Sequence, residues 1–112
     1  MTNLRMDVVR QDERVVVAFS GELDMAEVPR VQQELQELES SGPGLLVLDL
    51  RGVSFIDSSG LRVILESDIR GRRQGRRVAV VPGPEQVHRI FLIALLDKRL
   101  DFVDPSELED GP

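Results

Sequence analysis

LLVLDLRGVSFIDSSGLRVILE, residues 45–66, is the stretch that decides the fold of this chain. A short apolar run at 45–48 is typical of a strand buried on both faces. After an expected turn at Arg51-Gly52 comes a second apolar patch at 53–56. Apolar residues then recur at helical spacing, i, i+3, i+4 and i+8: Leu61, Ile64, Leu65 and Ile69. The polar segment Asp57-Ser58-Ser59-Gly60 therefore lies where a helix begins, at the end of a buried strand and loop.

Similar patterns predict the other elements, in the order β-β-α-β-α-β-α-β. An N-terminal hairpin is expected from two extended stretches, at 6–11 and 14–20. The further expected elements are helices at about 26–40, 59–74 and 84–96, and strands at 77–81 and 100–103. Because helices alternate with buried strands, most of the sheet should be parallel. The predicted fold is α/β, with a four- to five-stranded mixed sheet and three to four helices packed mainly on one face. The hairpin is expected to cover part of the other face.

Length and composition narrow the class of protein. The 112 residues suffice for one core, so we expect one domain at 1–103 and an acidic C-terminal tail at 104–112. No apolar run is long enough to span a membrane and no signal core is present, so a cytoplasmic protein without a membrane partner is expected. The absence of Cys excludes thiolate metal sites, and the net charge of −6 argues against nucleic-acid binding. Neither a metal nor a cofactor is expected, and the chain should be a monomer or a weak dimer.

Two kinds of chemistry at Asp57 and Ser58 are disfavoured by the rest of the sequence. A nucleophilic serine needs a base within reach, but His88 is the only histidine and no G-x-S-x-G motif is present. The chain is therefore not expected to be an enzyme. A phospho-aspartate switch needs acids after the first strand to hold Mg²⁺ and a lysine late in the chain. Lys98 is the only lysine, and it is not at a predicted strand end.

Phosphorylation of a serine by a partner kinase agrees better with this position. A phosphoserine adds about two negative charges, and a helix N-terminus is a ready site for an anion. The fold need not change, because the new charge alters a surface that a partner recognises. On residue types alone, plain helix capping by Asp57 or the serines stays open as the alternative.

Two segments of the chain resemble motifs of a known family. Residues 53–61, VSFIDSSGL, resemble the signature of bacterial anti-sigma factor antagonists, which are single STAS domains. Residues 20–24, SGELD, resemble the family's other characteristic segment and occur at a matching distance. The order of strands and helices matches along nearly the whole chain, so the resemblance implies a STAS-like fold over 1–103. One departure is the segment 93–98, IALLDK, which lacks the glycine that the family usually has after the third helix.

The resemblance also implies a partner-switching mechanism in the regulation of transcription. The unphosphorylated antagonist would bind an anti-sigma factor that is also a serine kinase, and so free the sigma factor. The kinase would then phosphorylate Ser58, and a phosphoserine phosphatase would restore it. Asp57 would contribute to kinase recognition, and Ser59 would serve mainly at the helix start. The residues implied in partner contact are Gly21, Glu22, Leu23, Asp24, Asp57, Ser58, Ser59 and Gly60.

Two other functions stay open at this point. The chain could be an unphosphorylated STAS subunit, acting as a structural or interaction module in a signalling or lipid-transport complex. A structural role needs no hydroxyl at position 58, so the pair Asp57-Ser58 favours the antagonist. Nucleotide binding is weaker still, because no phosphate-cradling Gly-rich loop is present.

Overall fold

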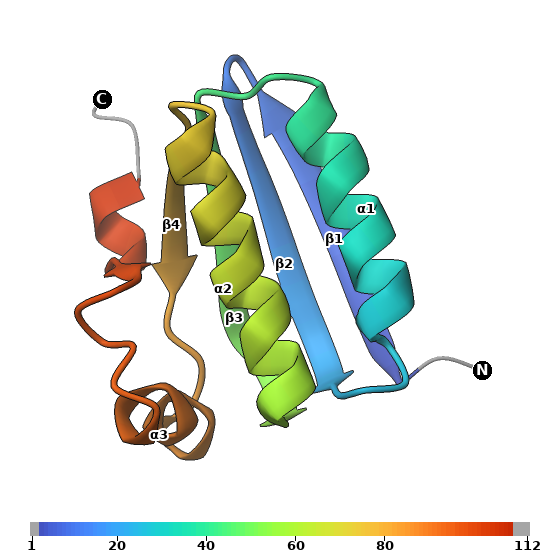
Figure 1. Cartoon of the computed structure of the whole chain (residues 1–112), viewed down its shortest axis with the longest axis vertical. Coiled ribbons are helices and arrows are strands. Elements are labelled where there is room, and N and C mark those ends of the chain that lie inside the picture. Colours follow the sequence, from blue (N-terminus) through green and yellow to red (C-terminus); the bar gives the residue numbers. More distant parts are fainter. Residues whose placement is uncertain (1–2, 109–112) are drawn as a thin grey trace.

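The chain forms a five-stranded sheet with helices against it (Figure 1). The computed structural model describes residues 3–108. Its elements are β1 (Leu4–Gln11), β2 (Arg14–Leu23), α1 (Val28–Ser40), β3 (Leu45–Ile56), α2 (Ser58–Arg73), β4 (Arg77–Val81), α3 (Glu85–Ile93), β5 (Asp101–Phe102) and the 3₁₀ helix η1 (Pro105–Leu108). The strand order is β1-β2-β3-β4-β5, with β1 antiparallel to β2 and all other neighbours parallel. The predicted α/β fold, with a mixed sheet and an N-terminal hairpin, is confirmed.

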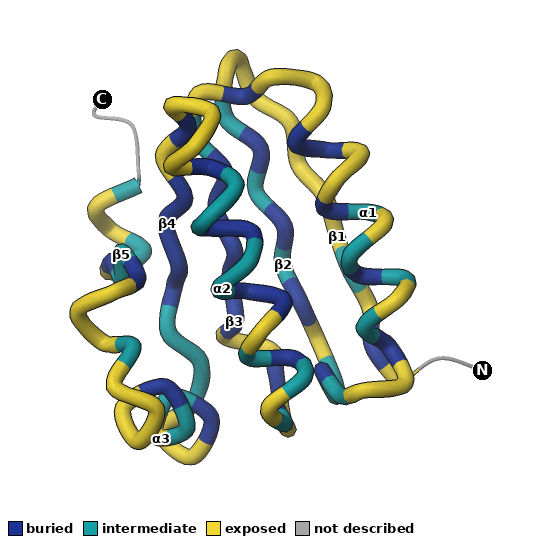
Figure 2. The backbone as a smooth tube through the Cα atoms, viewed as in Figure 1, coloured by how far each residue is buried: buried dark blue, intermediate teal, exposed yellow. Residues whose placement is uncertain are grey.

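One apolar core joins all three helices to one face of the sheet. Alternate residues of β2 point into it, as expected for a strand with a period of two. Its helical members come from all three helices: Val31, Leu35 and Leu38 of α1, Val63 and Ile64 of α2, and Val87 and Phe91 of α3. Buried and exposed residues alternate along α1 and α2 in Figure 2, as helices with one apolar face require. Placing the helices on one face was therefore correct.

The other face of the sheet is covered differently from the prediction. The hairpin does not fold over it, because β1 and β2 lie within the sheet itself. A smaller apolar cluster occupies this face, and Leu108 of η1 packs against it. A reciprocal capping pair stabilises η1: Glu107 accepts the Asp104 N–H at 2.7 Å, and Asp104 accepts the Ser106 N–H at 2.9 Å. Part of the expected tail is thus ordered against the sheet, while 109–112 lie outside the described residues.

β3 is one continuous strand, so the turn expected at Arg51-Gly52 is wrong. The pairing of β2 with β3 instead shifts register there, between Ala18 and Ser20. A Cβ on Gly52 would lie 2.7 Å from the carbonyl oxygen of Phe19, so the glycine allows a close approach of the two strands. β2 also continues to Leu23 rather than ending at Ser20. The two central strands therefore run on together as far as the start of α2.

α3 ends at Ile93, three residues earlier than predicted. Leu95 adopts a left-handed backbone conformation with φ of 59°, which stops the helix. The Leu96 N–H donates to the Phe91 carbonyl at 2.9 Å, and the Leu95 N–H donates to that of Leu92 at 3.0 Å. This pair of bonds is the Schellman motif, in which glycine is usual at the left-handed position. Leu95 thus takes the conformation that a glycine usually takes at the end of a helix. Within residues 3–108, no helix has the length and apolar character needed to cross a bilayer.

Candidate functional site

The carboxyl ends of β2 and β3 bring the two sequence motifs together. These strands are parallel, and Glu22 pairs with Phe55 and Leu23 with Ile56. The segments 20–24 and 53–61 therefore meet at the lower end of the molecule in Figure 1, where α2 begins. The structure thus gathers the residues that the sequence suggested into one region.

Asp57 caps α2 and ties it to the connection after β2. Its backbone is extended, with φ of −108° and ψ of −176°, and Oδ1 accepts the Gly60 N–H at 2.9 Å. Oδ2 accepts the Met25 N–H at 3.0 Å. Both carboxylate oxygens are therefore held by backbone donors of the same chain. Asp57, rather than Ser59, is the capping residue, so the simple structural role considered for this segment belongs to the aspartate.

Ser58 is the first residue of α2 and is exposed. Its hydroxyl makes no hydrogen bond to any other residue in the part of the chain that the structure describes. Ser59, the second residue of the helix, is only half-exposed. Of these two serines, Ser58 is therefore the more accessible to another protein.

Gly60 and Leu23 bring the first turn of α2 against the end of β2. Leu23 is fully buried, and Gly60 is buried against it. A Cβ on Gly60 would lie 2.3 Å from the Leu23 carbonyl oxygen and 2.8 Å from Leu23 Cγ. The glycine therefore serves a close approach within the chain, between the first turn of α2 and the end of β2. The Leu23 side chain points into the core, and the partner contacts expected for Leu23 and Gly60 stay predictions.

A glycine sets the backbone conformation of segment 21–24. Gly21 has φ of 108°, and a Cβ there would lie 2.1 Å from the Asn3 carbonyl oxygen. That same oxygen accepts the Glu22 N–H at 2.8 Å. Asp24 accepts the Ala26 N–H at 3.1 Å, which turns the chain toward α1. Glu22 and Asp24 are both partly exposed at the edge of the site.

A family model described as "Mlab, STAS domain" matches residues 6–104. The chain belongs to the STAS domain family. The match includes every strand and helix at the Ser58 site.

Relatives of this STAS domain are anti-sigma factor antagonists. The chain is 29% identical over 105 residues to the anti-sigma-B factor antagonist of Bacillus subtilis (strain 168), covering 94% of this chain and 95% of that protein. It is 24% identical over 107 residues to the protein of that name from Staphylococcus aureus (strain NCTC 8325 / PS 47), covering 96% and 99%. The crystal structure of an anti-sigma factor antagonist from Mycobacterium paratuberculosis superposes with a TM-score of 0.77 at 28% identity, covering 91% and 86%. The unphosphorylated antagonist SpoIIAA has the same fold, with a TM-score of 0.77 at 20% identity, covering 92% and 91%.

Two residues of this STAS domain that the sequence reasoning missed stand out at the site. Met25 is 72% exposed and Phe55 is 50% exposed. A signal for Phe55 was present, because Phe55 and Ile56 are adjacent apolar residues of one strand. Neighbouring strand residues point to opposite faces, and Ile56 is the one that enters the core. Nothing in the sequence alone distinguished Met25 from a residue that packs inside.

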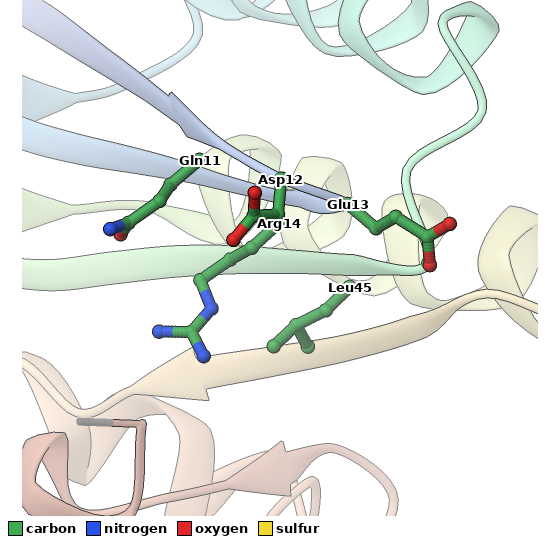
Figure 3. A pocket seen from close by; sticks show the side chains of 6 residues that line it. Gln11, Asp12, Glu13, Arg14 and Leu45 are labelled. Atoms are coloured by element: carbon green, nitrogen blue, oxygen red, sulfur yellow. The ribbon is translucent and has the colours of Figure 1, made fainter. Parts of the chain in front are cut away.

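A pocket lies away from this site, at the other end of β2. It measures about 390 Å³ and is lined by Gln11, Asp12, Glu13, Arg14, Gly44 and Leu45, at the turn of the hairpin and the start of β3 (Figure 3). The side chain of Glu13 points away from those of Gln11 and Arg14. Across residues 3–108, no three His, Cys, Asp or Glu side chains are grouped so that they could hold a metal ion. None of these features lies at Ser58, which is exposed at the surface of the described chain.

Proposed function

We propose that this chain is an anti-sigma factor antagonist that is switched by phosphorylation of Ser58. The unphosphorylated form binds an anti-sigma factor that is also a serine kinase, which frees the sigma factor. The kinase transfers the γ-phosphoryl group of ATP to Ser58 Oγ, whose proton is lost, and ADP leaves. A phosphoserine phosphatase hydrolyses the ester and restores the binding form. The chain itself is a substrate and a ligand in this scheme, acts in the cytoplasm and needs no contact with nucleic acid.

The observation that carries this proposal is the exposed hydroxyl of Ser58 at the start of α2. It directly follows the aspartate of the motif, and it has no partner among the described residues. The relatives named above support the class of protein. One of them, SpoIIAA, also has a structure in a phosphorylated form, which matches with a TM-score of 0.71.

The geometry indicates how a phosphate at Ser58 would act. The carboxylate of Asp57 already accepts the Gly60 N–H, so the anion site at the N-terminus of α2 is occupied by the chain's own charge. A phosphate on the next residue would be repelled by that carboxylate and stay at the surface. There it would oppose a partner through charge and through the cost of removing its water. The fold would stay the same while the affinity for the partner falls.

An unphosphorylated STAS subunit of a larger assembly is the second candidate. The matching family model supports this second candidate, because its description names Mlab rather than an antagonist. The two candidates differ in one respect that can be measured. An antagonist must accept phosphate at Ser58, whereas a structural subunit need not.

Incubation with ATP and the purified anti-sigma-class serine kinases of the source organism, followed by mass spectrometry of peptides, tests the proposal. We expect one phosphate, located on Ser58, which disappears in Ser58→Ala and persists in Ser59→Ala. Phosphate on Ser59 alone would overturn the assignment of the site. No phosphate with any kinase of this class would favour the structural subunit.

A further inference from the structure

Large apolar side chains are exposed at three places in the described chain. Two of them, Val8 and Val9, lie on β1, and three surround the end of α3: Leu92, Ile93 and Leu95. The remaining pair, Met25 and Phe55, lies beside Ser58. Neither Met25 nor Phe55 belongs to the two apolar clusters or packs against them as a partly buried neighbour. Packing in the core therefore does not explain why these two positions carry large apolar side chains.

The backbones of both residues lie close to Ser58. Phe55 is the next-to-last residue of β3, three residues before Ser58, which limits their Cα atoms to about 10 Å apart. The Met25 N–H is bonded to the carboxylate of Asp57, the residue just before Ser58. Met25 belongs to the connection that follows β2 and Phe55 to the neighbouring strand β3, so two different segments bring an exposed apolar residue to the part of the chain next to Ser58.

We infer that Met25 and Phe55 are the apolar anchors through which this surface binds the anti-sigma factor kinase. The inference rests on the function proposed above. Methionine and aromatic residues are enriched at protein interfaces, and a few such side chains usually carry most of the affinity. The unbranched thioether of Met25 can adapt to a partner's surface, while Phe55 supplies a rigid ring.

The polar residues around the pair agree with a protein as the occupant. Glu22, which pairs with Phe55, is partly exposed, and so is Asp24, next to Met25. Apolar anchors within a polar rim are the usual anatomy of a protein interface. Two acidic residues at the rim disfavour a nucleotide at the same place, because they would repel its phosphates. Phosphorylation of Ser58 would put a strongly hydrated group beside the anchors, where binding must exclude water.

The test compares single substitutions with a matched control. Met25→Ser and Phe55→Ser remove the anchors without touching the core. Val9→Ser is the control, because Val9 is also exposed, at 59%, but pairs with Val16 in the middle of the hairpin. The probe is the purified kinase that phosphorylates the wild-type chain, and the readouts are Kd by calorimetry and the KM and kcat of phosphorylation.

We expect each anchor substitution to weaken binding by about tenfold or more, the effect of losing an interface hot spot. KM for phosphorylation should rise with little change in kcat, and Val9→Ser should behave as the wild type. Wild-type Kd and KM values for both anchor variants would overturn the inference and leave the proposed function standing. Failure of the wild-type chain to bind or be modified by any kinase of the class would overturn the proposed function, and this inference with it.

Discussion

The carboxylate of Asp57 accepts the backbone N–H of Met25 at 3.0 Å, across 32 residues of sequence. Its other oxygen accepts the Gly60 N–H of the following helix. One side chain therefore fixes the connection after β2 relative to the start of α2. The position of Ser58 relative to segment 21–24 depends on this bridge, so Asp57 has a structural role at the site.

Replacement of Asp57 should separate the two halves of the bridge. Asp57→Ala loses the helix cap and the Met25 bond, and should lower the free energy of unfolding by about 1–2 kcal/mol. Asparagine is an equally good cap through Oδ1, so Asp57→Asn should cost less than Asp57→Ala. Its Nδ2, however, donates and cannot accept the Met25 N–H, so that bond is lost. Urea denaturation measures the stabilities, and amide hydrogen exchange should show Met25 unprotected but Gly60 protected in Asp57→Asn. Protection of both amides in Asp57→Asn would contradict the bridge.

Gly60 should not tolerate a side chain. A methyl group there would lie 2.3 Å from the Leu23 carbonyl oxygen, so the first turn of α2 would have to move. We expect Gly60→Ala to lower the free energy of unfolding by about 1–3 kcal/mol or more, as overpacking usually does. Gly44→Ala is the control, because its nearest neighbour would be 3.6 Å away. Equal stabilities of the two variants in urea denaturation would show that the close approach is not real.

Leu95 offers a stabilising substitution. It holds φ of 59° at the end of α3 while its side chain is 80% exposed, so the leucine adds strain and little burial. Leu95→Gly should raise the free energy of unfolding by about 0.5–1 kcal/mol. Leu92→Gly, inside the helix, should instead lower it by about 1 kcal/mol. Thermal denaturation measures the stability of both variants. A loss of stability in Leu95→Gly would contradict the left-handed conformation of Leu95.

Asp49 should make stability depend on acid pH. Burial alone would raise the pKa of Asp49, but hydrogen bonds and charge from Arg51 outweigh this, so the pKa lies below its ordinary value of 3.8. The ion pair, with Arg51 Nη2 2.8 Å from Asp49 Oδ2, therefore favours the folded state above the unfolded pKa, and this contribution is lost as pH falls through the lowered folded pKa. The stability difference between wild type and Asp49→Asn should stay constant from about pH 7 to 5 and shrink below about pH 4. Denaturation at several pH values measures it, and a difference that grows on acidification would contradict the sign.

The fold was predictable because local patterns and tertiary structure agree. Buried strands read as continuous apolar runs, and Pro29, tolerated only in a first turn, places the start of α1 close to Val28. A turn was wrongly predicted at Arg51-Gly52. In a sequence, a glycine that lets a neighbouring strand approach closely cannot be told from a glycine that forms a turn. The end of α3 was misplaced because leucine rarely adopts the left-handed conformation that Leu95 adopts.

The site was only partly predictable, because its key contacts join distant residues. Ser58 and the segment 21–24 followed from the motifs, but the bond from Met25 to Asp57 depends on the register of β2 against β3. A similar long-range pair joins α1 to α2, where buried Glu39 accepts a hydrogen bond from Arg70 at 2.6 Å. Sequence patterns show which faces are apolar, but they do not show which polar group on one element meets which on another.

The affinity of the phosphorylated and unphosphorylated chain for the cognate anti-sigma factor kinase tests the central claim most directly. Chain phosphorylated on Ser58 by that kinase and chain that has never been modified can be compared by calorimetry. The account predicts on the order of 100-fold weaker binding after phosphorylation, since misplaced charge at an interface costs several kcal/mol. Equal affinities of the two forms would contradict the claim that Ser58 is the switch.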